Sequence, residues 1–272
     1  MNFIKYSIYI LLITASIMAC NLERQIDLEI PEAPRELVIE CYLEPGQPMY
    51  ALVLESQGFF DTLGATNNPI VQGATVIISH NGQSDTLNPG IFTDGQKIYN
   101  YGNNNAIVPA DFTSEFSLEV TDATGRRATA TTRIMPQVPL DSITYEFLSD
   151  STAVVLTYNQ DDPNVPNFYR RLTHRTEYIP DSLQLDFFID DNITSDGQTI
   201  VGGPPIFEVN DTLIITLFHI TEEFYDYINT RQISVESNGN PFATPGVIVD
   251  NVEGGIGIFT GYSRYQEQII LE

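Results

Sequence analysis

The sequence contains no tryptophan and few cysteines or basic residues. Its 272 residues include two Cys and 12 Lys plus Arg against 36 Asp plus Glu, which gives a formal net charge of −24. The missing tryptophan removes the indole platforms on which ligand rings often stack, although fourteen tyrosines could stack on sugars or peptides. The scarcity of basic residues argues against a nucleic-acid partner, because phosphate binding needs basic patches.

A short export signal stands at the start of the sequence. Lys5 supplies its positive charge, and residues 6–18 form an apolar run too short to span a bilayer comfortably. The run ends in Ile17-Met18-Ala19-Cys20, which resembles the bacterial lipobox, where a small residue precedes a cysteine that becomes the acylated N-terminus. The alternative is an ordinary secretory signal that happens to contain a cysteine. We expect a lipoprotein signal peptide over residues 1–19 and lipidation (palmitate) of Cys20.

Lipidation of Cys20 would leave Cys41 as the one remaining thiol, so the sequence predicts no intramolecular disulfide. Cys41 alternates with Leu37, Ile39 and Leu43 on one face of an expected strand, which favours a buried, inert thiol over a nucleophile. Residues 20–35 are then a lipidated tether. We expect the protein to be anchored to the outer membrane by lipid. The sequence is compatible with either the surface face or the periplasmic face of that membrane.

The body has the period-two pattern of a mostly β protein. Phe116, Leu118 and Val120 alternate with polar residues, a turn over residues 122–125 follows, and a Thr-rich segment over 126–134 returns as the second strand of a hairpin. Short strands separated by Gly, Asn and Pro predict an N-terminal, immunoglobulin-like β-sandwich over residues 36–135.

Pro136 and Pro139 mark the expected boundary to a second β-rich domain over residues 140–272. Its predicted strands cover residues 142–148, 152–158, 168–178, 182–189, 198–201 and 207–218. One helix is predicted near residues 221–235, with Thr221 as its cap, an apolar stripe that includes Phe224, Tyr227 and Ile228 and extends toward Val235, and a stop at residues 238–241.

Local motifs for catalysis or cofactor binding are missing. Gly254-Gly255-Ile256-Gly257 lacks the Lys-Ser/Thr ending of a phosphate loop and precedes no predicted helix, so close backbone packing explains it better. His80, His174 and His219 stand singly, without the local partners of a zinc site. We therefore predict no catalytic residue, no cofactor and no metal.

Two sequence features, the acidic clusters and the Asp-Ser/Thr pairs, each allow a functional and a purely structural interpretation. The acidic clusters around residues 161–164 and 186–197 could bind Ca²⁺ or could form solvated turns, which is the commoner role of Asp and Asn. Six Asp-Ser/Thr pairs resemble an O-glycosylation sequon of exported Bacteroidota proteins, or simply open strands after turns: Asp61-Thr62, Asp85-Thr86, Asp141-Ser142, Asp150-Ser151, Asp181-Ser182 and Asp211-Thr212.

Several segments carry a family resemblance. Residues 240–243 with the glycine-rich 251–263, the helix entry at 219–225 and the opening strand at 37–43 resemble the lipoproteins of Bacteroidota called domain of unknown function 4249. In the opening strand, Cys41 stands where that pattern suggests glycine. The resemblance implies a cell-envelope lipoprotein, often encoded beside a TonB-dependent outer-membrane transporter, and it transfers no functional residue.

The expected function is therefore a non-catalytic binding or accessory component that works with a TonB-dependent transporter on an unknown ligand. The alternative is a structural or adhesive envelope lipoprotein without a dedicated ligand, and a hydrolase is the third candidate. An aromatic groove would favour binding, a flat polar surface would favour the structural role, and a deep cleft with perturbed carboxylates would favour the enzyme.

Overall fold

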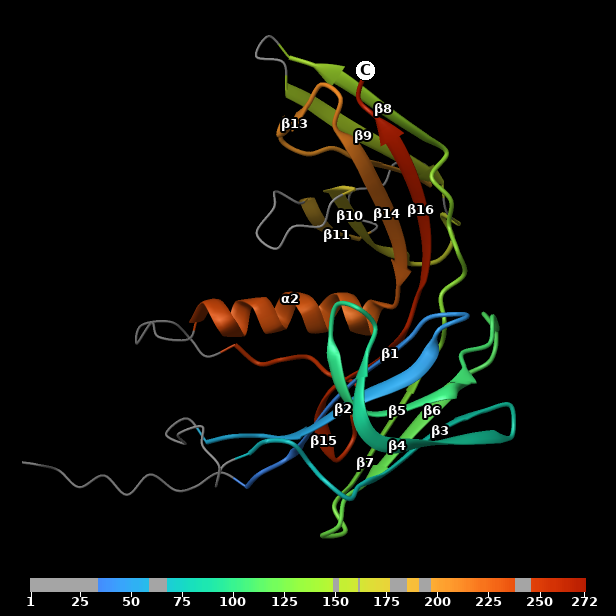
Figure 1. The fold of residues 1–272 in the computed structure, drawn as a ribbon, viewed down its shortest axis with the longest axis vertical. Helices are drawn as coiled ribbons and strands as arrows, with labels where there is room; N and C mark the ends of the chain where they lie inside the picture. The colour runs from blue at the N-terminus through green and yellow to red at the C-terminus, as the bar shows by residue number, and fades with distance from the viewer. Residues whose placement is uncertain are drawn as a thin grey trace, which may run out of the picture. The chain divides into compact units, whose positions relative to one another are not determined.

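The computed structural model describes residues 34–58, 68–148, 152–160, 162–176, 185–190, 197–237 and 246–272. These residues confirm a mostly β protein in which a β-sandwich is followed by a second β-rich region with one α-helix (Figure 1). Residues Arg35–Glu272 form one unit. In this part of the chain, no helix is long and apolar enough to cross a membrane.

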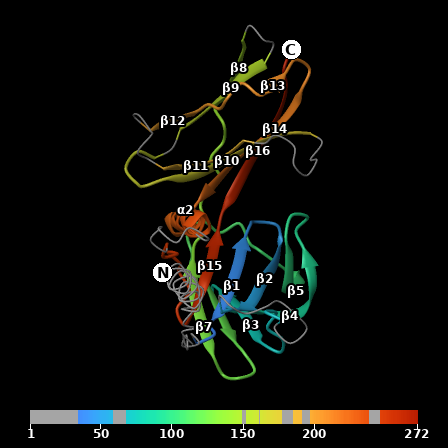
Figure 2. The same cartoon turned by 90° about the vertical axis from the view of Figure 1, so that its left-hand side faces the viewer.

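The sandwich is built from eight strands that hydrogen-bond in the order β15-β1-β2-β5-β4-β3-β6-β7. Figure 2 shows β15, β1 and β2 side by side. The long strand β4 pairs with β5 on one side and β3 on the other, and its register shifts between Pro89 and Phe92. The bounds are β1 (Leu37–Leu43), β2 (Pro48–Glu55), β3 (Thr75–His80), β4 (Gln83–Thr93), β5 (Ile98–Ile107), β6 (Phe116–Thr121), β7 (Arg127–Thr132) and β15 (Gly255–Gly261).

Alternation of buried and less buried residues along strands such as β1, β2 and β6 fills the sandwich core. In β1 every second residue is buried, including Cys41, while Glu40 and Tyr42 face the other way. The predicted hairpin is confirmed as β6 paired with β7, with Gly125 at φ +90° in its turn. Buried apolar side chains drive this packing because their transfer out of water is favourable. They include Ile39, Val53, Ile78, Phe116, Val120 and Phe259.

One strand of the sandwich comes from the far end of the sequence. β15 pairs in parallel with β1, although residues 255–261 lie outside the range 36–135 expected for this sandwich. Gly257 allows the close approach, because a Cβ on it would overlap the Ile39 carbonyl of β1. Gly254, in the turn just before β15, lies equally close to the Arg127 carbonyl of β7. The structural interpretation of these glycines is confirmed, since both lie tightly against other backbone.

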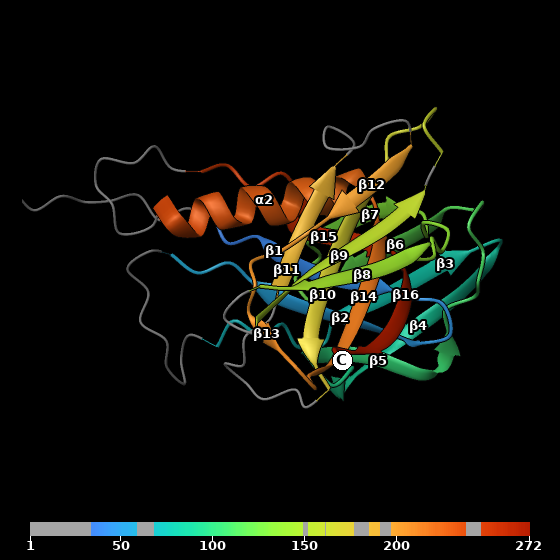
Figure 3. The ribbon, with the colours of Figure 1, turned by 90° about the horizontal axis from the view of Figure 1, so that it is seen from above.

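The second region has two sheets, one over the other (Figure 3). One has the order β11-β10-β14-β16, and in the other β9 pairs with β8 on one side and with β12 and β13 on the other. The bounds are β8 (Ser142–Phe147), β9 (Thr152–Gln160), β10 (Phe168–Arg175), β11 (Leu185–Asp190), β12 (Gln198–Val201), β13 (Phe207–Glu208), β14 (Thr212–Ile220) and β16 (Ser263–Ile270).

The prediction of one continuous strand over residues 207–218 is wrong. A turn at Asn210, with φ +70°, divides it into β13 and β14, which belong to different sheets. The Asp211 carboxylate accepts hydrogen bonds from the backbone N–H of Glu208 (2.8 Å) and from Arg175 (2.9 Å). These bonds hold the turn, since Asn tolerates the left-handed region and Asp satisfies turn N–H groups.

The helix α2 spans Glu222–Ser237 and confirms the predicted one. The Thr221 hydroxyl accepts a hydrogen bond from the backbone N–H of Phe224 at 3.3 Å, as an N-cap does. Phe224 and Tyr227 are buried, and the helix packs against β15 and β10. Val235 does not extend the buried stripe, because it is 59% exposed. The predicted stop at residues 238–241 lies outside the described residues.

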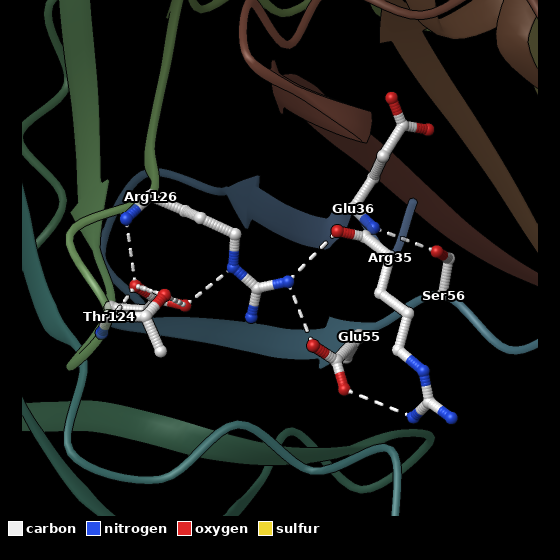
Figure 4. Close-up of polar contacts among 7 residues, drawn as sticks. Arg35, Glu36, Glu55, Ser56, Thr124 and Arg126 are labelled. Atoms are coloured by element: carbon white, nitrogen blue, oxygen red, sulfur yellow. Dashed lines mark hydrogen bonds and ion pairs between the residues drawn. The ribbon is translucent and has the colours of Figure 1, made fainter. Parts of the chain in front are cut away.

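A polar network fixes the entry of the chain into β1 (Figure 4). The Arg126 guanidinium donates to Asp122 (2.7 Å) and to the Arg35 carbonyl (2.9 Å), and it pairs with Glu55 (2.8 Å). Arg35 itself reaches the other oxygen of Glu55 at 3.3 Å. The network therefore ties the β6–β7 turn and the end of β2 to the residues that precede β1.

Candidate functional site

The candidate site is a cleft of about 490 Å³ where the sandwich meets the second region. The sandwich contributes residues of β1, β2 and the β4–β5 hairpin, and the second region contributes residues of β10, β14, α2 and the start of β16. The strand alternation explains the position of the β1 residue: Tyr42 points out of the sandwich because its neighbours Cys41 and Leu43 point in.

Aromatic rings form one wall of the cleft. Tyr42 meets Phe224 edge to face, with ring centroids 5.6 Å apart. Phe224 stacks toward Tyr262 at 6.5 Å, and Tyr262 meets Phe218 edge to face at 5.6 Å. Such pairs are favourable geometries for rings and hold the side chains in place. The wall is therefore a continuous, pre-formed apolar surface.

A second aromatic group comes from the sandwich. Tyr50 lies 5.6 Å from Tyr99 and stacks on Phe92 at 5.4 Å. The hydroxyl of Tyr99 donates to Asp94 at 2.7 Å, and that of Tyr50 donates to Asn104 at 2.7 Å. Each ring thus has a fixed polar end and an apolar face, as in many ligand sites.

Three of the twelve basic residues of this acidic chain line the cleft, each paired with a carboxylate. The Lys97 amine bonds to Glu40 and lies 5.1 Å from the centre of the Tyr42 ring. Arg264 pairs with Glu44 at 2.6 Å. The third basic residue, Arg170, donates through Nε and Nη2 to the two carboxylate oxygens of Asp186, each at 2.8 Å.

Burial dominates the electrostatics of these groups. It raises the pKa of the Tyr42 and Tyr262 hydroxyls, so both remain protonated donors at neutral pH. Burial, together with the charge of Arg231, lowers the pKa of the Lys97 amine to about 8, which leaves it mostly protonated. Burial also raises the pKa of Glu44, against the attraction of Arg264. The cleft therefore offers rings, neutral hydroxyls and paired charges, an arrangement suited to binding.

The residues singled out by the sequence lie elsewhere. Cys20 falls outside the described residues. Cys41 is fully buried in the sandwich core, and burial raises the pKa of its thiol. His80 stacks on Phe116 and contacts Asp111 at 3.1 Å, while His219 bonds to the Pro136 carbonyl. Cys41, His80 and His219 do not line the cleft.

The acidic clusters have local partners where they are described. Asp162 accepts from the backbone N–H of Asn164 at 3.0 Å, an ordinary turn bond, and Asp186 pairs with Arg170. Within the described ranges, no group of three His, Cys, Asp or Glu is placed to hold a metal ion. Of the six Asp-Ser/Thr pairs, three lie outside the described residues. Asp141-Ser142 and Asp211-Thr212 stand where β8 and β14 begin, and Asp85-Thr86 lies within β4.

One feature of the sequence could have pointed to the cleft. Lys97 is the single lysine after residue 5, and it lies two residues from Tyr99 in a chain with few cations. Its partners Glu40 and Tyr42 are more than fifty residues away, however, and no local spacing connects them. The cleft was therefore not predicted.

Comparison with solved structures gives only weak likenesses. A cytokine receptor complex is 12% identical, covers 66% of this chain and 82% of its own, and has a TM-score of 0.26. The FN1–FN3 domains of chicken CNTN1 are 10% identical, with 87% and 67% covered and a TM-score of 0.32. A DUF4785 family protein from Legionella pneumophila is 11% identical, with 66% and 52% covered and a TM-score of 0.24. TM-scores this low do not establish a shared fold.

No curated protein matches the chain. The model of the family described as "Domain of unknown function (DUF4249)" matches residues 23–268, which include both the sandwich and the second region with its helix. The chain therefore belongs to the DUF4249 family.

Proposed function

We propose that this protein is an outer-membrane lipoprotein of the Bacteroidota, held by lipid on Cys20, whose body is a non-catalytic binding component of a TonB-dependent transporter. The observation that carries the binding role is the cleft with its wall of Tyr42, Phe218, Phe224 and Tyr262. Ligand sites are typically concave and mostly apolar, with a few fixed polar groups, and this cleft fits that description.

The chemistry of the cleft favours binding over catalysis. Its cations, Lys97, Arg170 and Arg264, are each paired with a carboxylate, and its half-buried tyrosines Tyr42 and Tyr262 stay protonated at neutral pH. A general acid or base needs a group that changes protonation near the working pH and is accessible to the substrate. Lys97 has a pKa of about 8, but its amine is bound to Glu40. Rings and paired charges instead suit an amphipathic ligand, such as a peptide segment or a sugar, that stacks and forms hydrogen bonds.

The choice of a transporter as partner rests on two expectations: a lipid anchor on Cys20 would hold the body at the membrane, and the family resemblance implies a gene often found beside such a transporter. The formal net charge of −24 supports an encounter with basic loops of the partner, because complementary charge steers association. Since surface charges are screened by salt, we expect the association to weaken as ionic strength rises.

The anchor is tested by replacing Cys20 with Ser in the full chain and fractionating the cells. The parent should be found with the outer membrane and Cys20→Ser should be released from it. A variant that stays in the membrane pellet as the parent does would show that the anchor is not lipid on Cys20.

The partner and the cleft are tested by crosslinking in intact cells, followed by mass spectrometry. We expect recovery of a TonB-dependent barrel with the parent chain and loss of that barrel with Cys20→Ser. Gln96 is exposed and lines the cleft, so Gln96→Trp should obstruct it, whereas Gln83→Trp places the same ring at an exposed position of β4 outside the lining. Lower recovery of the barrel with Gln96→Trp alone would indicate that the cleft contacts the barrel, whereas equal recovery with both Trp variants would show that the barrel binds elsewhere on the body. Turnover of a peptide or glycan by the purified protein would replace binding with catalysis.

A further inference from the structure

The second β-rich region has polar side chains in the middle of its core. Arg171 on β10 is fully buried, although the adjacent Arg170 faces the cleft. The other buried polar residues in this core include Thr157 and Asn159 on β9, Thr173 on β10 and Thr199 on β12. A buried charge is strongly unfavourable unless other groups compensate for it.

Half of the Arg171 guanidinium is compensated by the chain. Its Nη1 atom reaches across to the opposite sheet, where it donates to the Val201 carbonyl at 2.8 Å and to the Thr157 hydroxyl at 3.3 Å. The guanidinium also lies 5.1 Å from the centre of the Phe187 ring. Among the described residues, no carboxylate forms an ion pair with Arg171.

The other half has no hydrogen-bond partner among the residues that the structure describes. The Nε and Nη2 atoms of Arg171 are buried and form no hydrogen bond. These two atoms share one edge of the guanidinium, the edge with which Arg170 holds both oxygens of Asp186 at 2.8 Å. The Nε and Nη2 edge, a fork of two parallel donors, therefore binds a carboxylate in Arg170 but has no hydrogen-bond partner among the described residues in Arg171.

Further donors of the same core are also unused. The side-chain amide of Asn159 and the hydroxyls of Thr173 and Thr199 are buried without a hydrogen-bond partner. Asn159 and Thr199 are direct partners in the β9–β12 pairing. Thr157 and Val201, which Arg171 contacts, form the pair two residues further along the same two strands. Buried polar groups are almost always paired, so this concentration calls for an occupant.

We propose that the Nε and Nη2 edge of Arg171 binds a small monovalent anion inside the second region. A negative charge compensates the guanidinium, and the two unused N–H groups on this edge are the donors that an anion requires. The complete burial of Arg171 limits the occupant to a halide or a small planar oxyanion such as formate or bicarbonate. This site is separate from the cleft and does not depend on the proposed transporter role.

The first experiment is a crystal structure of the full chain grown in sodium bromide. We expect an anomalous bromide peak within hydrogen-bond distance of both Nε and Nη2 of Arg171. Ordered water alone at these atoms, or a carboxylate of the chain itself on that edge, would overturn the proposal. A parallel crystal in sodium formate separates the two sources: a planar density on the fork identifies an oxyanion, and retained chloride identifies a halide.

The second experiment measures thermal unfolding of the full chain in chloride, bromide or formate, each replacing gluconate at constant ionic strength. A ligand that binds only the folded state raises the melting temperature, by about 3–6 °C at ten times its dissociation constant. This rise should vanish in Arg171→Met and persist in Arg175→Met, a control on the same strand whose arginine pairs with Asp211. Should Arg171→Met not fold, Arg171→Lys, which keeps a charge without the fork, takes its place. An equal rise in parent and Arg171 variants would overturn the proposal.

Discussion

Gly257 on β15 lies directly beside Ile39 on β1, so close that a Cβ on Gly257 would overlap the Ile39 carbonyl. The φ of Gly257 is +132°, a conformation that L side chains rarely adopt. The pair joins the last part of the chain to the first strand of the sandwich. It therefore determines whether residues 255–261 can complete the sheet beside which α2 and the cleft are built.

We expect Gly257→Ala to destabilise the protein by more than about 3 kcal/mol, because backbone strain at this φ adds to the overlap with Ile39. The matched control is Gly82→Ala. Gly82 also has a positive φ, +77°, but a Cβ there would meet nothing within 4 Å, so only strain of about 1 kcal/mol is expected. Urea unfolding measures both. Similar losses at the two positions would show that the close approach of β15 to β1 is not what requires glycine.

Asp122 should make the stability depend on acid pH. Burial opposes its ionisation, but hydrogen bonds from Arg126 and Thr124 outweigh burial and lower its pKa to about 2. Its unfolded value is near 3.8, so the folded state favours the ionised form. This stabilisation is complete above pH 4 and is lost as pH falls from about 4 to about 2.

We therefore expect Asp122→Asn to lower stability at pH 7 by about 1–3 kcal/mol, since the buried end of the Arg126 network loses its charge, and to flatten the unfolding free energy between pH 4 and 2. The control is Glu119→Gln. Glu119 pairs with Arg127 on the surface, where both side chains are largely exposed to solvent, so Glu119→Gln should leave the stability nearly unchanged. An unchanged acid profile in Asp122→Asn would exclude Asp122 as its source.

The thiol of Cys41 should be inert in the folded protein. It is fully buried and its pKa is raised by burial, so almost no thiolate is available to react. In the Cys20→Ser variant, which leaves Cys41 as the single thiol, a chromogenic disulfide reagent at pH 8 should detect no thiol in the native state and one in urea. Rapid native reaction would show that the β1 face of the sandwich opens readily.

The N-cap of α2 should contribute to stability and to the shape of the cleft. Thr221 caps Phe224 and also bonds to the Thr260 hydroxyl at 3.1 Å in a buried position. Thr221→Ala should cost about 1–2 kcal/mol, while Thr221→Ser keeps the hydroxyl and should cost less. Thermal unfolding compares them. Equal losses would assign the role of Thr221 to its methyl group instead of its hydroxyl.

The sequence by itself determined the local elements of the described body. The alternation in β1 predicted that Cys41 is buried, because successive strand residues point to opposite faces. The position of Thr221 before two acidic residues and an apolar stripe predicted the start of α2, since capping depends on neighbours within one turn. The hairpin of β6 and β7 followed from a turn of four residues between two alternating strands.

Only the tertiary structure decided what combines distant segments. Residues 255–261 join the first sheet through pairing with β1, more than two hundred residues away, and no local pattern specifies a strand's partner. The cleft brings together Tyr42, Lys97, Phe224 and Tyr262 from four separated segments. Arg170 and Arg171 make the same point at short range. Alternation dictates that they face opposite sides, but only the packing of the two sheets decides which guanidinium meets Asp186 and which is buried without a charged partner among the described residues.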